Sequence, residues 1–176
     1  MALHTHACIL ISAGAEWRPL LESFPEAKTE ITPYGECFPA HLAGQNLWFM
    51  HGGWGKVAAA GSTQYAIDRW KPARLINLGT CGGFTGRIQR GDVVLARKTI
   101  IYDIIEQMSD QDQAIEKYSV EFDLAWLPEP PPQPVIISTL VSADRDILTG
   151  DIPSFCLLYT SPSPRDRTRS RMPSSA

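Results

Sequence analysis

Two glycine-rich segments carry the clearest chemical signal in the chain, and each follows directly after an apolar run. Their sequences are His51-Gly-Gly-Trp-Gly-Lys56 and Asn77-Leu-Gly-Thr-Cys-Gly-Gly-Phe84. Glycine lets the backbone approach a ligand closely and adopt a positive φ. Two such turns at the strand ends of an α/β sheet predict a small-molecule site at the carboxyl edge of that sheet.

The second segment offers hydrogen-bond donors. Consecutive turn amides from Gly79 to Gly82, together with the Thr80 hydroxyl, form a set of donors suited to a sugar oxygen, a phosphate or an attacking water. The alternative is a strand end that merely needs glycines. Cys81 suggests a nucleophile, but the sequence places no histidine to activate it. We therefore expect Gly79, Thr80, Cys81 and Gly82 to bind substrate without covalent catalysis.

The first segment also matches the dinucleotide-binding pattern G-x-G-x-x-A, from Gly53 to Ala58. That pattern needs an acidic residue at the end of the next strand to bind ribose. The next predicted strand ends in Asn77-Leu78, and Asp68 lies earlier, within a predicted helix. A purely structural tight turn stays an alternative. We expect no nucleotide cofactor.

An α/β pattern surrounds these turns. Apolar runs and turn signals predict a buried strand over 7–12, a helix over 16–23 with Pro19 in its first turn, a hairpin with arms 37–43 and 47–51, a helix over 56–70, strands over 74–78 and 135–140, and β-prone sequence over 91–96 and 99–102. Residues 103–133 are less regular and include a proline-rich stretch. Strands that alternate with helices predict a mostly parallel, covered sheet.

Composition narrows the class of protein. The chain has 176 residues, 44% of them hydrophobic, and a net charge of −3, which is typical of a globular domain and offers nucleic acid or an anionic membrane no basic surface. The cysteines before residue 156, Cys8, Cys37 and Cys81, lack metal-ligand spacing, so we expect no metal. With no secretory leader and no long apolar span, we expect a cytoplasmic protein.

Three stretches resemble a known family in order and spacing. They are Gly53-Trp-Gly-Lys-Val-Ala-Ala-Ala60, Lys71-Pro-Ala-Arg-Leu-Ile-Asn-Leu-Gly-Thr-Cys-Gly-Gly83 and Gly91-Asp-Val-Val94. They are similar to segments of the nucleoside phosphorylase and nucleosidase superfamily, and most similar to methylthioadenosine/S-adenosylhomocysteine nucleosidases. The resemblance implies a three-layer α/β/α fold with a mixed, mostly parallel sheet, no cofactor, a purine-type nucleoside substrate and, for the full-length protein, a homo-oligomer.

Cleaving an N-glycosidic bond requires an acid to protonate the base and a nucleophile near ribose C1′. Phosphorolytic relatives have a G-D-P turn after the first strand, whereas this chain has Ser12-Ala-Gly-Ala-Glu16. A carboxylate there would repel phosphate, and it could orient and deprotonate water. We therefore expect Glu16 to be catalytic and the reaction to be hydrolysis. A solvated Glu16 in the first helical turn, a phosphorylase and a non-catalytic nucleoside-binding protein stay alternatives.

The resemblance also implies roles for other residues. Trp54 would line the pocket for the 5′ substituent, although a tryptophan often belongs to the core, and Thr80 would lie beside the ribose and the nucleophile. Ser142 and Asp144 would lie near the base, unless Asp144 only caps a turn. Asp146 stands where relatives carry an aromatic residue, which puts the preference for adenine in doubt. By the same resemblance, Tyr102-Asp103 would lie near a segment that borders the pocket.

The last residues differ from the rest in composition. Residues 156–176 are rich in Ser, Pro and Arg, and they resemble the translation of a sequencing-library adapter, with a native basic tail as the alternative. We expect residues 1–155 to be the N-terminal part of a single phosphorylase-like domain, truncated in its C-terminal part, and residues 156–176 to be a non-native, disordered tail. The family's later strands, which bind ribose and protonate the base, are missing, so we expect this chain to be inactive.

Overall fold

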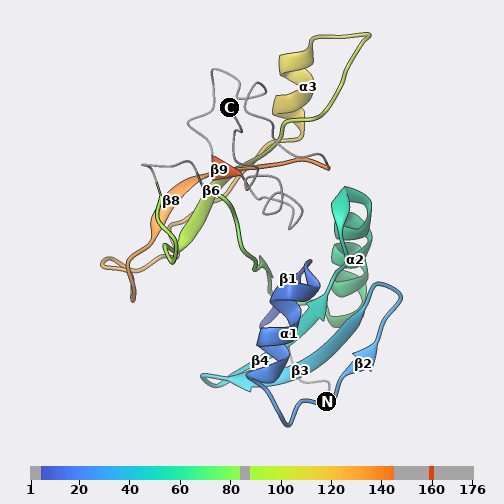
Figure 1. Ribbon diagram of the computed structural model, residues 1–176, viewed down its shortest axis with the longest axis vertical. Coiled ribbons are helices and arrows are strands. Elements are labelled where there is room, and N and C mark those ends of the chain that lie inside the picture. Colours follow the sequence, from blue (N-terminus) through green and yellow to red (C-terminus); the bar gives the residue numbers. More distant parts are fainter. Residues whose placement is uncertain (1–4, 84–87, 145–158, 161–176) are drawn as a thin grey trace, which may run out of the picture. The chain divides into compact units, whose positions relative to one another are not determined.

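The computed structural model describes residues 5–83, 88–144 and 159–160. The chain forms two compact units, Met1–Thr80 and Cys81–Ala176, and each is described by itself. Figure 1 shows their helices and strands in sequence colours. Both units contain β-sheets with helical segments, as the sequence predicts.

The first unit holds a five-stranded sheet in the order β2-β3-β4-β1-β5 (Figure 1). The strands are β1 (Ala7–Ile11), β2 (Glu30–Ile31), β3 (Glu36–Leu42), β4 (Gln45–His51) and β5 (Arg74–Asn77), and the helices are α1 (Gly14–Glu22) and α2 (Gly55–Trp70). The central strand β1 runs parallel to β4 on one side and to β5 on the other, whereas β3 is antiparallel to β4. The sheet is therefore mixed, as expected.

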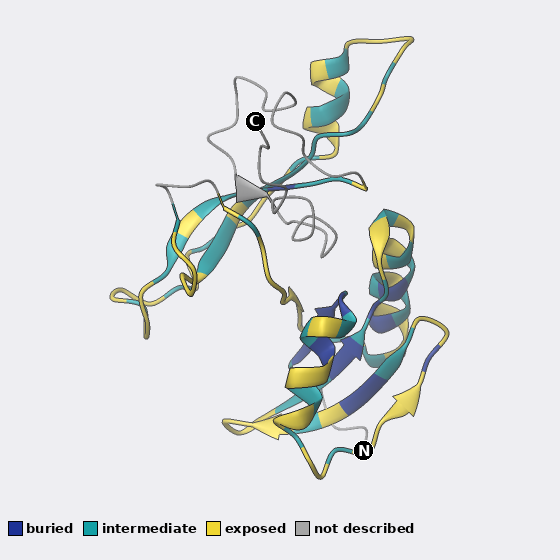
Figure 2. Ribbon diagram, viewed as in Figure 1, coloured by how far each residue is buried: buried dark blue, intermediate teal, exposed yellow. Residues whose placement is uncertain are grey.

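Successive side chains of β1 alternate between the two faces of the sheet, and a helix covers each face. Ala7, Ile9 and Ile11 face a cluster that contains Trp17 of α1, with Leu20 and Leu21 packed against it. Cys8 and Leu10 face the opposite cluster, which contains Ala66 of α2. Because successive side chains of a strand point to opposite faces, α1 and α2 cover the two sides of the sheet. The first unit is thus a three-layer α/β/α arrangement, and Figure 2 shows its inner strands as the most buried part.

Element ends follow local backbone chemistry, and two of them differ from the predictions. The hairpin turns at Ala43 and Gly44, both with positive φ, so its second arm begins at Gln45 and not at Leu47. Helix α1 begins at Gly14, two residues before the predicted start, because Ala13 has extended dihedrals. Pro19 therefore lies in the second turn of α1, where it leaves one intrahelical hydrogen bond unmade.

The second unit holds the sheet order β7-β6-β8-β9. Its elements are β6 (Val94–Ile101), α3 (Gln111–Lys117), β7 (Val120–Glu121), β8 (Ile136–Ser142) and β9 (Tyr159–Thr160). Strands β6 and β8 are parallel, with one register irregularity between Ala96 and Lys98. The two β-prone stretches predicted over 91–96 and 99–102 are one strand, since this irregularity lets the pairing continue through Arg97.

Residues 103–133 are more ordered than the sequence suggested. Helix α3 forms because the Asp110 carboxylate caps it, accepting hydrogen bonds from the amides of Asp112 and Gln113. Strand β7 pairs with β6. Of the predicted adapter-derived tail, the structure describes Tyr159–Thr160 alone, and the remainder lies outside the described residues. The predicted disorder of that tail stays a prediction.

One buried polar atom stands out in the first unit. The His51 ring, at the end of β4, stacks on the indole of Trp17 with 5.6 Å between ring centroids. Its Nε2 atom is buried and has no hydrogen-bond partner among the described residues. A buried polar group without a partner costs about 1–3 kcal/mol of folding free energy.

Replacing His51 with phenylalanine should stabilise the fold. The ring stack on Trp17 is kept and the unpaired nitrogen is removed, so the free energy of unfolding should rise by about 1 kcal/mol. Urea unfolding of the chain, followed by tryptophan fluorescence, measures this change. An unchanged or lower midpoint for H51F would contradict the interpretation.

Candidate functional site

The carboxyl ends of three parallel strands meet at one edge of the first sheet. Ile11 of β1 pairs with His51 of β4, and Leu10 of β1 pairs with Asn77 of β5. The pairing continues past the strand ends, since the Leu78 amide donates to the Leu10 carbonyl at 2.9 Å. The two glycine turns therefore lie at the same sheet edge, as predicted. The strands that precede the two turns, β4 and β5, are not neighbours, because β1 lies between them.

Helix α1 brings an acid to this edge. Oε1 of Glu16, in the first turn of α1, accepts hydrogen bonds from the Thr80 amide and the Thr80 hydroxyl, both at 2.6 Å. Glu16 is therefore partly exposed and held by two donors, and its catalytic role stays a prediction. Sequence reasoning named both residues but did not predict that they would contact each other.

The glycine at position 79 leaves room for this contact. A Cβ atom added to Gly79 would lie 3.1 Å from Oε2 and 3.3 Å from Oε1 of Glu16. A side chain at this position would require the carboxylate to shift by a few tenths of an ångström. Gly79 thus allows the turn to approach Glu16, rather than only easing a bend of the chain.

The Thr80 contact corrects one expectation about the second turn. The Thr80 amide and hydroxyl are not donors for a ligand, because both already donate to Glu16. A hydroxyl that has given its hydrogen keeps only acceptor lone pairs. Oε2 of Glu16 accepts no hydrogen bond from the described residues. The pair therefore presents acceptor atoms, which suit a water molecule or a sugar hydroxyl better than an anion.

Trp54 does not belong to the core. It is 50% exposed and lies at the N-cap of α2, directly after the first glycine turn. Gly53 and Gly55 on either side of it have φ of 77° and 81°, values that favour glycine. The turn therefore holds an exposed indole at the sheet edge that carries Glu16 and Thr80, and the core alternative for Trp54 is wrong.

The cysteines are poorly suited to nucleophilic chemistry. Burial raises the pKa of Cys8 to about 12 and that of Cys37 to about 11. Desolvation also raises the pKa of Cys81, although the residue as a whole is exposed. Since the thiolate is the reactive form, none of the three is activated at neutral pH.

The second unit gathers the other predicted residues at the carboxyl ends of β6 and β8. Ser142 pairs with Ile101, and its carbonyl accepts a hydrogen bond from the Tyr102 amide at 3.2 Å. The Asp144 amide donates to Oδ2 of Asp103 at 3.0 Å. Tyr102-Asp103 and Ser142–Asp144 are thus neighbours within this unit. Asp146 lies outside the described residues.

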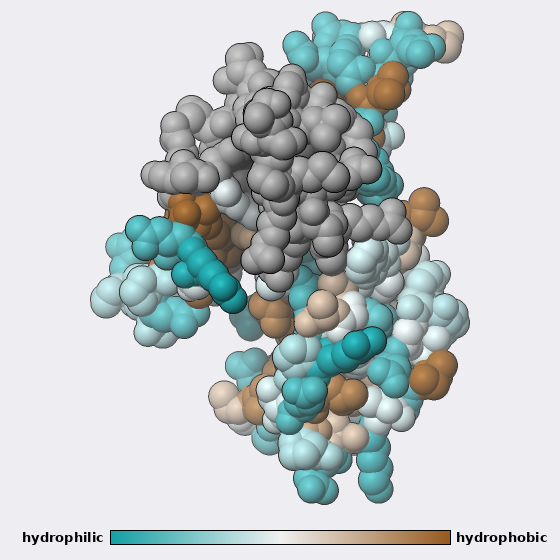
Figure 3. Space-filling model, in the orientation of Figure 1, coloured by the Kyte–Doolittle hydropathy of each residue, from teal (hydrophilic) through white to brown (hydrophobic). Residues whose placement is uncertain are grey.

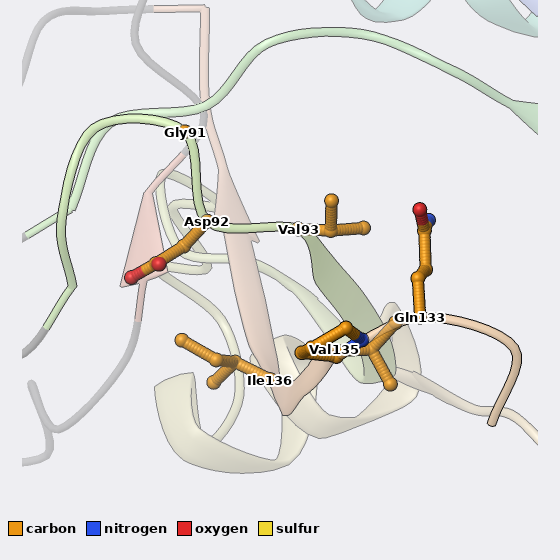
Figure 4. A pocket seen from close by; sticks show the side chains of 7 residues that line it. Gly91, Asp92, Val93, Gln133, Val135 and Ile136 are labelled. Atoms are coloured by element: carbon orange, nitrogen blue, oxygen red, sulfur yellow. The ribbon is translucent and has the colours of Figure 1, made fainter. Parts of the chain in front are cut away.

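A hollow of about 330 Å³ lies at the opposite end of β6 and β8 (Figure 4). Its lining includes Asp92, Gln133 and Ile136, at the amino ends of the strands. Figure 4 shows the Asp92 and Gln133 side chains pointing apart, and Asp92 accepts a hydrogen bond from the Gln89 amide. Its polar groups do not converge on a ligand, so this hollow is not the candidate site.

Three features of the surface and the described side chains relate to membrane spanning and metal binding. Among the coloured residues of Figure 3, hydrophobic side chains form separate patches between hydrophilic ones. No helix in the described ranges is long and apolar enough to cross a membrane. Within the same ranges, no three His, Cys, Asp or Glu side chains cluster in a way that could hold a metal ion.

Solved structures with similar folds include several nucleosidases. A Neisseria meningitidis 5′-methylthioadenosine/S-adenosylhomocysteine nucleosidase in complex with methylthio-immucillin-A matches 90% of this chain and 75% of its own, with a TM-score of 0.69 and 20% identity. A Streptococcus pneumoniae MTA/SAH nucleosidase in complex with 8-aminoadenine has a TM-score of 0.71, and a Helicobacter pylori futalosine hydrolase has 0.70 at 13% identity. At these identities the likeness shows the fold.

Sequence comparison points to the same group of proteins. Nucleosidases of that first kind from Bacillus thuringiensis (strain Al Hakam) and Bacillus anthracis are 36% identical to this chain over 89 residues, which is 51% of the chain and 38% of each relative. The match thus spans well under half the length of these curated relatives. The sequence profile of the phosphorylase superfamily matches residues 6–148, most of the chain. The chain belongs to the phosphorylase superfamily.

Proposed function

We propose that the full-length protein hydrolyses the N-glycosidic bond of a purine-type nucleoside similar to methylthioadenosine or adenosylhomocysteine. The observation that carries the proposal is the Glu16 carboxylate held by Thr80 at the carboxyl edge of β1 and β5. The superfamily match and the nucleosidase relatives support the reaction class.

The reaction needs a water placed beside ribose C1′. In our proposal, Oε2 of Glu16 and the lone pairs of Thr80 Oγ1 accept hydrogen bonds from this water and from a ribose hydroxyl. As the bond from C1′ to the base nitrogen breaks, positive charge grows on the sugar, and a nearby carboxylate stabilises it. The water oxygen then bonds to C1′, its proton passes to Glu16, and the base leaves with a proton from an acid.

The same groups argue against phosphate as the nucleophile. A phosphate ion needs donors and positive charge, whereas Glu16 supplies a carboxylate, and both donors of Thr80 are already used by it. Phosphate would therefore face acceptor atoms and like charge. Water carries no charge and can donate to both oxygens, so hydrolysis fits this edge better than phosphorolysis.

We place the 5′ substituent of the substrate against Trp54. The indole is half exposed on the turn that follows β4, where it offers an apolar surface to a thioether group. We further propose that Gly79, Cys81 and Gly82 line the ribose side of the site, and that Ser142 and Asp144 contribute to the base side. In the second unit, Ser142 and Asp144 are hydrogen-bonded to Tyr102 and Asp103, which supports a shared role for these four residues.

The wider setting follows from the sequence and the family. We propose that residues 1–155 belong to one phosphorylase-like domain, and that the full-length protein is a cytoplasmic homo-oligomer that acts on a small nucleoside and needs no cofactor. The free cysteines Cys8, Cys37 and Cys81 fit a reducing compartment. The acidic net charge gives no support to a nucleic-acid or membrane partner.

Base release by the full-length protein should not require phosphate. Rates with methylthioadenosine in phosphate-free buffer and in phosphate buffer should agree within about twofold, because water is the nucleophile. Chromatography of the sugar product separates free methylthioribose from its 1-phosphate. Strict dependence on phosphate would establish a phosphorylase, and ligand binding without any product would establish a non-catalytic binding protein.

Replacing Glu16 with glutamine should lower kcat by at least about 100-fold, because an amide cannot take the proton of water. Substrate affinity should fall less than kcat, because the glutamine oxygen can keep both hydrogen bonds from Thr80 while its NH2 group takes the place of Oε2 and can still donate to a ribose hydroxyl oxygen. Glu22→Gln is the matched control, because Glu22 is an exposed acid on the same helix. Equal rates for E16Q and E22Q would remove Glu16 from the mechanism.

Trp54→Ala should reduce discrimination in favour of a 5′-thioether. The ratio of kcat/KM for methylthioadenosine to that for adenosine should fall by about tenfold, the usual effect of losing apolar contact with a small group. Val57→Ala provides a control, because Val57 is a highly exposed residue of the same helix. If both substrates lose activity equally, Trp54 does not contact the 5′ substituent.

A further inference from the structure

The first turn of α1 has no side-chain cap. Its N-cap residue, Ala13, has no side-chain hydrogen bond to the helix. The amides of Glu16 and Trp17 both reach the same acceptor, the Ala13 carbonyl, at 2.9 Å. Pro19, one turn on, has no amide to donate. Contacts between this turn and the sheet can therefore contribute to its position.

The Trp17 side chain anchors that turn to the sheet. It is 3% exposed, and its indole Nε1 donates to Oε2 of Glu36, at the start of β3, at 2.8 Å. One side of the indole stacks on His51 at the end of β4, and Phe38 of β3 packs against it with ring centroids 5.5 Å apart. The hydrogen bond to a carboxylate is of the stronger, charge-assisted kind.

Trp17 directly follows Glu16, so the anchored residue and the acid share one helical turn. A rotation or slide of this turn would move the Glu16 carboxylate away from the Thr80 amide and hydroxyl. We propose that Trp17 is a positioning residue, which sets the Glu16 carboxylate against Thr80 through its bond to Glu36 and its stack on His51. The role of this position in catalysis rests on the proposed function.

A matched pair of variants at Glu36 tests the anchor. Glu36 is partly buried at the start of a strand, and in Glu36→Gln the amide oxygen still accepts from the indole. Glu36→Met keeps the length and removes the acceptor. The measured quantity is the rate of amide hydrogen exchange at Thr80 divided by the rate at Leu78. Leu78 serves as the reference because its amide donates to Leu10 of β1 and not to Glu16. This measurement needs the chain alone and no substrate.

The exchange ratio of Thr80 to Leu78 should rise about tenfold in Glu36→Met and in Trp17→Phe, because Glu16 no longer holds the Thr80 amide firmly. It should stay at the wild-type value in Glu36→Gln. Phe49→Leu controls for a general loss of core packing, since Phe49 lies in the same cluster without contacting Trp17 in any ring pair. An unchanged ratio in Glu36→Met, or an equal rise in Phe49→Leu, would overturn the proposal.

Kinetics of the full-length protein test the catalytic part separately. Trp17→Phe and Glu36→Met should lower kcat by about 10- to 100-fold with KM within about twofold, because a displaced carboxylate affects the transition state more than binding. Glu36→Gln should restore the wild-type rate. If the exchange ratio responds as stated while the wild-type protein cleaves no nucleoside, the anchor stands and the proposed function falls.

Discussion

The parallel pairing of β1 with both β4 and β5 is the constraint on which the candidate site depends. Register along these strands places their carboxyl ends at one edge, and the hydrogen bonds that continue past the strand ends start the two glycine turns there. Helix α1 directly follows β1, which lies between β4 and β5. The first turn of α1 therefore lies next to the turn after β5. The contact between Glu16 and Thr80 follows from that order of strands.

Strand β1 is also the centre of the hydrophobic core. Every residue of β1 is buried, and the side chains on its two faces belong to two separate clusters, one under α1 and one under α2. Trp17 connects the first cluster to the candidate site. Its indole is buried in that cluster, and the residue before it, Glu16, lies at the sheet edge. The free energy of burying this side chain therefore also stabilises the geometry of the acid.

Chemistry at the edge is decided by which hydrogen-bonding groups are already used. The Thr80 amide and hydroxyl both donate hydrogen bonds to Glu16, and Gly79 leaves room for the carboxylate. With these donors used, the edge presents the acceptor atoms of the Glu16 carboxylate and the Thr80 hydroxyl. In the second unit, Asp103 uses a carboxylate oxygen on the Asp144 amide, which draws the segments after β6 and β8 together.

Sequence by itself determined the local elements, the fold class and the residues of interest. Apolar runs, glycines and the hairpin signal are local properties, so β1, β4, α2 and β5 were predicted to within about two residues, and Glu16, Thr80 and Trp54 were named. Helix α3 was missed because its Asp110 cap lies in a stretch without apolar periodicity. Only the tertiary structure decided that β1 separates the two glycine turns, that Thr80 gives its donors to Glu16, and that Trp17 is held between His51 and Glu36. Those facts depend on strand order and on contacts between residues 19 to 64 positions apart, which local patterns do not encode.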